Sequence, residues 1–320
     1  MPDPAIAVVG PTASGKSAVA FDVARRAGDV DLVSIDAMQV YRGMDIGTAT
    51  PGADERRLVP HHLIDLIEPS EEFSVAEFQQ RYEAARAAIA ASGRRALLVG
   101  GTGLYHRVVI DRLEVPGTWP ALRQRLEADA GADGVASPQL HAVLARLDPD
   151  AARRMEPTNT RRIVRALEVS LGAGRPFSSF GPGLDEYSTA SGVVQIGLRW
   201  DREALSRRIE ERVHAMIAAG WLDEVAELAE LDLSRTASQA LGYRELADHL
   251  AGRWSLEEAV AATVQRTRQF AVRQLRWFRR DPRIRWVDVE DDPVAEARGE
   301  VERALSQTVA SARSAIAGPS

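Results

Sequence analysis

The stretch GPTASGKS at residues 10–17 decides the fold, and it directly follows the apolar run AIAVV at residues 5–9. It fits the pattern G-x-x-x-x-G-K-[ST], whose glycines let successive backbone N–H groups face a phosphate. In this pattern Lys16 neutralises phosphate oxygens and the Ser17 hydroxyl reaches Mg²⁺, while the following helix N-terminus attracts the anion. The alternative is a turn that merely contains Gly and Lys. A strand before the loop and a helix from Ser14 to about Arg26 favour the phosphate-binding loop.

Strands alternate with helices over much of the chain. Strands are expected at residues 31–36, 62–66, 94–101 and 192–200, and an amphipathic helix at residues 75–92. This alternation predicts an α/β fold, a P-loop NTPase-like, mostly parallel sheet flanked by helices. Ligands bind such sheets at the carboxyl ends of the strands. We therefore expect the loop, Asp36 and Gly100–Thr102 to converge on one site.

The domain organisation follows from where the strand signal stops. Residues 116–191 show helical patterns only, which predicts an all-helical insertion domain. The P-loop core domain is then discontinuous, with residues 1–115 plus 192–290, and it ends in basic helices. Residues 291–320 are polar and rich in Ala and Ser, and we expect a frayed tail.

The charge is unevenly distributed. The chain has a net charge of −6, yet residues 266–286 hold eight arginines and one aspartate. Arginines interleaved with Phe and Trp suit an RNA partner. The alternative is a solvated amphipathic helix whose aromatic residues belong to the core. Of the 40 basic residues only Lys16 is a lysine, which fits a background preference for Arg codons and also a need for a compact ammonium at this one position.

Composition excludes several classes of protein. The chain has no cysteine, which rules out disulfides, thiolate metal sites and cysteine nucleophiles. It has no apolar run long enough to cross a bilayer and no basic N-terminal region typical of a signal peptide, so we expect a cytoplasmic protein without a membrane partner. His61 and His62 have no second ligand at helical spacing and are interpreted as structural.

Two further features carry chemistry. Asp36 ends an apolar strand and could be a Mg²⁺ ligand, a general base, or simply a turn or N-cap aspartate. The strand at residues 94–101 ends in Gly-Gly-Thr and lacks the acid that ATP-hydrolysing P-loop proteins usually carry there. Gly100–Thr102 could let a ligand approach the backbone closely, or could only allow a helix to start.

Together these motifs resemble the tRNA dimethylallyltransferase family. The resemblance runs in order through GPTASGKS, DAMQVYRGMDIGTA at residues 36–49, PHHLID at 60–65 and LLVGGTGLY at 97–105. It continues through TRRIVRALEV at 160–169, RIEERVHAMIAAG at 208–220, LGYRE at 241–245 and TRQFAVRQLRWF at 267–278. The resemblance implies an enzyme that transfers a dimethylallyl group from dimethylallyl diphosphate to N6 of the adenosine 3′ of the anticodon in tRNA, with Mg²⁺ as cofactor. We expect a monomer.

The resemblance also implies roles for single residues. Asp36 would be the general base, with Lys16 and Thr102 as further catalytic residues. The donor's diphosphate would be held by Gly10, Pro11, Thr12, Ala13, Ser14, Gly15, Lys16, Ser17 and Arg212, with Ser17 on Mg²⁺. The residues implied to contact tRNA are Asp36, Ala37, Met38, Gln39, Thr102, Arg123, Arg161, Arg162, Arg165, Gly242, Tyr243 and Arg244, and Gln239 belongs to the same stretch as the last three. Where the family usually has D-S-x-Q this chain has D-A-M-Q, so a bond through that serine hydroxyl is missing.

Three other functions compete with this reading. A small-molecule kinase would use ATP, but the missing second acid and the basic segment argue against it. A non-catalytic, nucleotide-gated RNA-binding protein would need only the loop and the basic segment. Prenylation of free adenine nucleotides remains a close relative of the main hypothesis, and the helical insertion favours the polymer.

Overall fold

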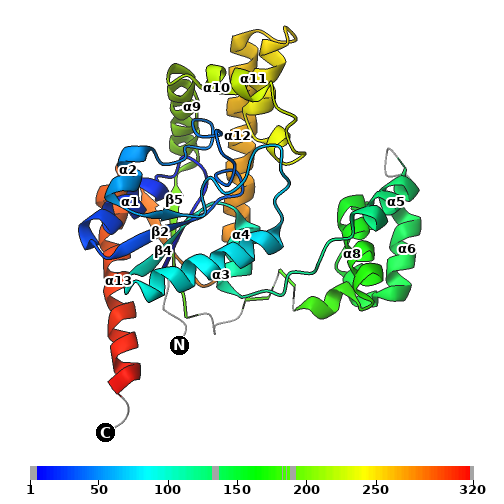
Figure 1. The fold of residues 1–320 in the computed structure, drawn as a ribbon, viewed down its shortest axis with the longest axis horizontal. Coiled ribbons are helices and arrows are strands. Elements are labelled where there is room, and N and C mark those ends of the chain that lie inside the picture. Colours follow the sequence, from blue (N-terminus) through cyan, green and yellow to red (C-terminus); the bar gives the residue numbers. More distant parts are fainter. Residues whose placement is uncertain (1–5, 132–136, 182, 185, 188–191, 318–320) are drawn as a thin grey trace. The chain divides into compact units, whose positions relative to one another are not determined.

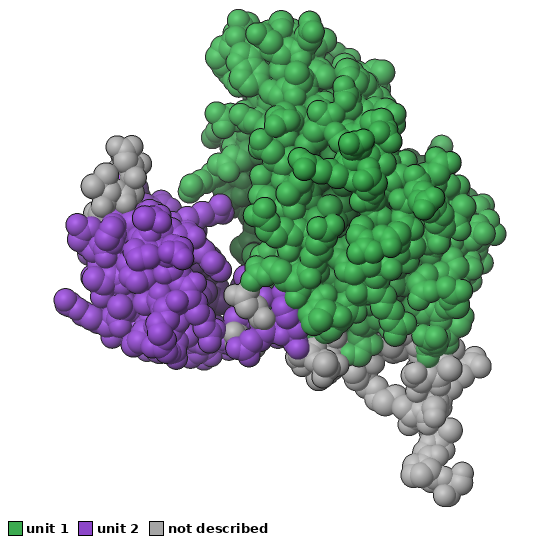
Figure 2. All heavy atoms as spheres, turned by 180° about the vertical axis from the view of Figure 1, so that it is seen from behind, with its two compact units in different colours: residues 1–110, 188–320 green, residues 111–187 purple. Residues whose placement is uncertain are grey.

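The computed structural model describes residues 6–131, 137–181, 183–184, 186–187 and 192–317, with side chains up to residue 307. The chain divides into two compact units (Figure 2). Unit 1 comprises residues 1–110 and 188–320, and unit 2 comprises residues 111–187. Unit 2 begins and ends a few residues earlier than the insertion expected from the sequence.

Unit 1 contains a sheet of parallel strands (Figure 1). Among the described residues the strand order is β3-β2-β4-β1-β5-β6. The strands are β1 (Ile6–Val9), β2 (Val30–Ile35), β3 (His61–His62), β4 (Arg95–Gly100), β5 (Val194–Trp200) and β6 (Ile284–Val289). Each neighbouring pair is parallel. β1 and β2 are buried along their whole length, as expected for strands covered on both faces. The predicted α/β fold is confirmed.

Helices cover both faces of this sheet (Figure 1). The chain moves from β1 past β4 to β2 through α1 (Lys16–Ala27), and it returns from β3 to β4 through α3 (Val75–Ala91). Because parallel crossovers are right-handed, opposite directions of travel place α1 and α3 on opposite faces. α13 (Pro293–Ala317) packs beside α1, and α4 (Gly103–Ile110) packs beside α3. The short α2 (Ala53–Leu58) precedes β3.

A helical segment connects β5 to β6. Its helices are α9 (Arg202–Ala218), α10 (Trp221–Leu228), α11 (Tyr243–Leu250) and α12 (Leu256–Phe278), with a 3₁₀ turn at Ala237–Gln239. α12 packs against α4, α9 and α11. Its Gln274 side chain reaches the carboxyl edge of the sheet, where it bonds to Thr12 and Gly101.

The structure shortens one expected strand and adds another. The strand expected at residues 62–66 ends at His62, because Leu63 and Asp65 have φ values of 63° and 52°, which no extended strand allows. β6 is not expected from the sequence, which predicts basic helices at the end of the core domain. β6 is an edge strand, with Ile284 and Val289 at its two ends buried and Arg285 and Asp288 exposed.

The prediction of a frayed tail from residue 291 is wrong for the stretch that forms α13. Ala297, Val301, Ala304 and Leu305 are buried in the core of unit 1. They recur every three to four residues, so a helix gathers them on one face. The N-terminus of α13 is also stabilised, because the Glu296 carboxylate accepts hydrogen bonds from the N–H groups of residues 290, 291 and 292.

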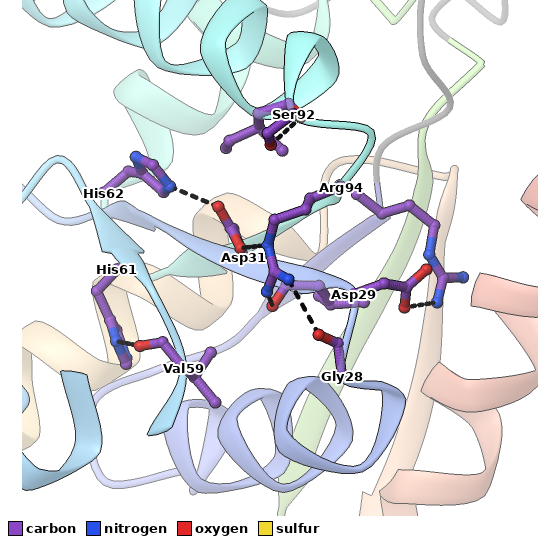
Figure 3. Close-up of polar contacts among 11 residues, drawn as sticks. Gly28, Asp29, Asp31, Val59, His61, His62, Ser92 and Arg94 are labelled. Atoms are coloured by element: carbon purple, nitrogen blue, oxygen red, sulfur yellow. Dashed lines mark hydrogen bonds and ion pairs between the residues drawn. The ribbon is translucent and has the colours of Figure 1, made fainter. Parts of the chain in front are cut away.

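A charged network stabilises the amino end of β2, at the far end of this strand from Asp36 (Figure 3). Asp31 is 4% exposed and accepts hydrogen bonds from Arg94 Nε at 2.5 Å and His62 Nε2 at 2.9 Å. His61 Nδ1 donates to the Val59 carbonyl at 2.7 Å. The two histidines thus face different partners and serve the fold.

Unit 2 has its own small core. Its helices are α5 (Pro120–Ala130), α6 (Ser137–Leu147), α7 (Pro149–Arg153) and α8 (Thr160–Ala173), followed by a 3₁₀ turn at Phe177–Phe180. Leu126, Leu144, Ile163 and Leu167 are buried among them. In the described part of the chain, neither unit has a helix that is long and apolar enough to span a membrane.

Candidate active site

Three neighbouring strands end level with one another. In the register of the sheet Val9 of β1 and Ile35 of β2 both lie beside Gly100 of β4. The next residues along the chain are Gly10, Asp36 and Gly101, at the carboxyl edge. Adjacent strands lie about 4.8 Å apart, so the loop after β1 and the aspartate after β2 are separated by about 10 Å. The expected convergence of the loop, Asp36 and the Gly100–Thr102 turn is what the structure shows.

The loop at residues 10–17 is held in shape from outside. Ala13 and Gly15 have φ values of 61° and 85°. The Trp200 Nε1–H donates to the Ser14 carbonyl at 3.0 Å, and Arg208 Nε donates to the Ala13 carbonyl at 3.1 Å. In a trans peptide the C=O and the next N–H point in opposite directions, so the bond to the Ser14 carbonyl turns the Gly15 N–H away from Trp200. The loop is thus shaped before any anion binds.

Two cations and one carboxylate share this loop's surroundings. Burial lowers the pKa of Lys16 to about 8, although Asp36 works in the other direction and Arg212 adds a smaller lowering. Burial also lowers the pKa of Arg212, again opposed by Asp36. Lys16, Arg212 and Asp36 therefore interact electrostatically, and two positive charges against one negative charge leave the site positive. A half-buried surplus of positive charge at a helix N-terminus is a site for an anion.

Asp36 is fixed by its own turn. The Met38 N–H donates to Asp36 Oδ1 at 2.9 Å, and the Ala37 N–H donates to Thr102 Oγ1 at 3.0 Å. Thr102 therefore connects the end of β4 to the turn that carries Asp36. Among the described residues no hydrogen bond reaches Asp36 Oδ2, so this oxygen is available to accept a proton.

Two residues that the family resemblance implies to contact tRNA have side chains engaged inside unit 1. Gln39 Oε1 accepts from Ser34 Oγ at 2.7 Å, and Gln39 Nε2 donates to the Ala49 carbonyl at 3.0 Å. Tyr243 is 3% exposed and donates to Glu224 Oε1 at 2.7 Å. The Gln39 side chain therefore links β2 to the segment at Ala49, and the Tyr243 hydroxyl is bonded to α10. Neither side chain is left unbonded to meet tRNA.

Glu224 and Trp221 of α10 hold the loop at residues 45–47. The Glu224 carboxylate accepts hydrogen bonds from the N–H groups of residues 45, 46 and 47 at 2.7–3.3 Å, besides the one from Tyr243. Trp221 lies so close to Gly47 and Gly242 that a Cβ on either would come within 2.3 Å of its ring. Gly242 is thus needed for close packing, whereas Arg244 is exposed.

The arginines of unit 2 fall into two groups. Arg161 and Arg162 are exposed on the first turn of α8, which Asn159 caps. Arg165 instead donates to the Pro116 carbonyl at 3.0 Å and pairs with the buried Glu168, and Arg123 pairs with Glu127 at 3.0 Å. The first group is free to meet a polyanion, and the second also stabilises unit 2.

The basic segment at residues 266–286 is less uniform than its sequence suggests. Arg266 pairs with the buried Glu245, and Arg268 pairs with Glu210. Phe278 is buried and Trp277 packs on Gly103, where a Cβ would come within 2.3 Å of the indole. Trp277 and Phe278 thus belong to the packing of α12, while Arg273, Arg276 and Arg279 are exposed.

Sequence reasoning missed one polar residue at the centre of the site. Gln274 of α12 is 7% exposed, accepts a hydrogen bond from the Thr12 N–H, and donates one to the Gly101 carbonyl, both at 2.9 Å. The signal was a polar residue on the buried face of the helix, three or four positions from Ala271 and Phe278. The density of arginines around it hid this signal.

The donor atoms at the loop suit a magnesium ion bound with a phosphate. Ser17 lies exposed in the first turn of α1, and the described residues contain no cluster of three or more His, Cys, Asp or Glu that could hold a metal alone. Mg²⁺ commonly keeps several waters and takes few protein ligands when substrate phosphates supply the rest. A hydroxyl beside a phosphate loop therefore fits such an ion.

Comparison with known proteins agrees with these observations. Residues 39–281 match the model of the IPP transferase family. A tRNA dimethylallyltransferase from Pseudarthrobacter chlorophenolicus is 50% identical over 92% of this chain and 97% of its own length. The crystal structure of a full-length tRNA isopentenylpyrophosphate transferase from Bacillus halodurans is 36% identical, with a TM-score of 0.70 over 99% of this chain and all of that one. The crystal structure of a tRNA delta(2)-isopentenylpyrophosphate transferase from Staphylococcus epidermidis is 32% identical, with a TM-score of 0.65 over 95% of this chain and 99% of that one. The chain therefore belongs to the IPP transferase family, the family of the tRNA dimethylallyltransferases.

Proposed function

We propose that this chain transfers a dimethylallyl group from dimethylallyl diphosphate to N6 of the adenosine on the 3′ side of the anticodon in tRNA. Its membership of the family supports this reaction. The observation that carries the proposal is the pairing of a positive phosphate loop with a single carboxylate two strands away. The first suits a diphosphate leaving group, and the second suits a nucleophile that must lose a proton.

On the donor side, the loop holds the diphosphate while the bond between the allylic carbon and its oxygen breaks. Negative charge then grows on the leaving oxygens, and Lys16, Arg212 and the loop N–H groups oppose it. Because Trp200 and Arg208 fix the loop beforehand, these groups need not reorganise during the reaction. Preorganised charge of this kind is worth several kcal/mol in a site shielded from water.

Magnesium completes the donor site in this proposal. Ser17 would hold the ion through its hydroxyl, beside the phosphate oxygens. When bound, Mg²⁺ supplies additional positive charge to the leaving diphosphate.

On the acceptor side, Asp36 takes the proton. The amine lone pair of adenine is delocalised into the ring, so N6 is a weak nucleophile until it can lose a proton. As the N6–carbon bond forms, the proton passes to Asp36 Oδ2, and prenylated tRNA and diphosphate are released. General base catalysis contributes about 10²–10⁴-fold. Thr102 keeps Asp36 in place through the Ala37 N–H.

Recognition of the polymer requires more of the chain. The adenine must leave the anticodon-loop stack to reach the carboxyl edge of the sheet. We assign backbone contacts with tRNA to the exposed Arg161, Arg162 and Arg244, with unit 2 as the domain that serves tRNA. Arginines suit RNA phosphates because their charge is permanent and their donors are planar.

One experiment separates the rival functions. The protein is incubated with Mg²⁺, labelled dimethylallyl diphosphate and unmodified tRNA, with AMP replacing tRNA in one arm and ATP replacing the donor in another. We expect label in tRNA alone. Label only in AMP would assign the enzyme to free nucleotides, phosphate transfer from ATP would make it a kinase, and no transfer at all would refute the proposal.

A further inference from the structure

One side chain joins the two halves of the candidate active site. Gln274 Oε1 accepts from the Thr12 N–H in the phosphate loop, and Gln274 Nε2 donates to the Gly101 carbonyl at the end of β4. Both bonds are 2.9 Å long, and the side chain is 7% exposed. The amide thus has each of its polar ends satisfied by a different strand end.

The helix that carries this amide is firmly placed. Ala271 and Phe278 on the same face of α12 are each 1% exposed. One turn beyond Gln274, Trp277 packs directly on Gly103. A buried side chain on such a helix has little freedom, so its amide acts as a fixed spacer.

Gly101 in the Gly100–Thr102 turn explains how α12 comes so close, and Gly100 makes room for β2. A Cβ at Gly101 would lie 2.4 Å from Gln274 Nε2 and 3.2 Å from the Gly10 carbonyl oxygen. A Cβ at Gly100 would lie 2.1 Å from the Ile35 carbonyl oxygen. Here the glycines leave room for neighbouring protein groups, not only for a ligand.

The bonds continue from Gly101 to the general base. Thr102 follows Gly101 directly, and its Oγ1 accepts the hydrogen bond from the Ala37 N–H. Ala37 follows Asp36. The series therefore runs from Thr12 through Gln274 and the Gly101–Thr102 turn to the residue beside Asp36.

We propose that Gln274 is a positioning residue that sets the distance between the phosphate loop and the general base. We assign it no contact with either substrate: it acts through Thr12 on one side and the Gly101–Thr102 turn on the other. Its bond also occupies the Thr12 N–H, so the donor's diphosphate is held by the other N–H groups of the loop. The inference rests on the proposed prenyl transfer.

The test replaces the amide by an apolar side chain of similar length, Gln274→Met. The exposed Gln265 on the same helix, outside the basic segment at residues 266–286, provides a matched control, Gln265→Met. Single-turnover rates are measured at saturating donor and tRNA, and the donor dissociation constant is measured without tRNA. Rates are divided by the fraction of protein that binds donor, so that misfolded molecules do not count.

We expect Gln274→Met to lower the rate per competent site by about 100-fold, because a displacement of reacting groups by about 1 Å can cost this much. The donor dissociation constant should change less than about threefold. The control should match wild type in both. If the rate per competent site is unchanged, or if donor binding falls as steeply as the rate, Gln274 does not set the distance and the proposal is wrong. A role in folding alone would lower the competent fraction and leave the rate per site intact.

A second variant guards against a folding defect. Gln274→Asn keeps an amide but is one methylene too short to reach both partners, so we expect the same loss of rate. If neither variant yields protein that binds donor, Gln274 is a folding residue and the proposal fails.

A double-mutant cycle with Thr102→Val tests the route to Asp36. If both changes act through the same turn, their effects on rate are not additive, whereas independent effects multiply. Independence would overturn the route. Failure of the proposed function looks different from all of these results, because wild type itself would then transfer no label to tRNA.

Discussion

Replacing Lys16 by methionine should stabilise the ligand-free protein at neutral pH while weakening the donor site. Burial lowers the pKa of Lys16 from 10.5 to about 8. Each pKa unit corresponds to about 1.4 kcal/mol, so keeping this ammonium charged in the folded, empty site costs about 3 kcal/mol. Methionine fills a similar volume without the charge. Its loss of the 3.3 Å hydrogen bond to the Pro11 carbonyl offsets part of that gain.

The pH dependence has a definite sign. Below pH 8 both the folded and the unfolded wild type carry the Lys16 proton, and the full penalty applies. Between about pH 8 and pH 10.5 the folded protein has released a proton that the unfolded chain still holds, so the stability of wild type rises with pH. Lys16→Met has no such group. Its advantage over wild type should therefore shrink across this window and vanish near pH 10.5.

The assay compares urea unfolding of wild type and Lys16→Met at pH 7 and pH 10 in the same salt. Because both proteins share every other titrating group, the difference between them isolates Lys16. The reasoning is refuted if the variant is no more stable than wild type at pH 7, or if the difference does not change with pH.

The composition of the chain allows a direct check. Lys16 is the only lysine, so protein labelled with ¹³Cε-lysine gives one side-chain resonance from the phosphate loop itself. Its titration midpoint should lie near pH 8 and should move upward when inorganic diphosphate is added, because an anion favours the ammonium. A midpoint above pH 10 in the empty protein would contradict the burial of Lys16.

Other substitutions test the remaining assignments. Asp36→Ala should lower the single-turnover rate by about 10²–10⁴-fold and leave donor binding within about threefold; lost donor binding would make Asp36 chiefly a metal-site residue. Tyr243→Phe removes a hydrogen bond to the Glu224 carboxylate and should lower the free energy of unfolding by about 1.5–3 kcal/mol in urea titrations, and an unchanged midpoint would contradict that bond. Replacing Arg161 and Arg162 by alanine should raise the KM for tRNA and flatten its dependence on salt, because fewer counterions are released; an unchanged salt slope would remove both from the tRNA surface.

Much of this fold could be predicted because its signals are local. The loop at residues 10–17 combines a buried strand, glycines and a helix start within a short segment. The ends of β2 and β4 are marked by Asp36 and Gly100, and parallel topology alone brings such ends to one edge. Such signals can be recognised within a short segment, without knowing how the rest of the chain packs.

The parts that could not be predicted depend on distant contacts. The sequence of α13 is polar and rich in alanine, and only its packing beside α1 shows that Val301 and Leu305 belong to the core. Gln274 meets Thr12 across 262 positions of sequence. The periodicity of α12 shows that Gln274 lies on a buried face, but not which residue it will contact.

The same limit applies to roles assigned by resemblance, because a motif identifies a position and not the atom that acts there. Ala37 stands where the family usually has serine, and the missing hydroxyl suggested a missing bond. In the structure the bond that ties this turn to Thr102 comes from the Ala37 backbone N–H, at 3.0 Å. Every residue except proline supplies that donor. The hydrogen bond between this turn and Thr102 therefore does not depend on the side chain of residue 37.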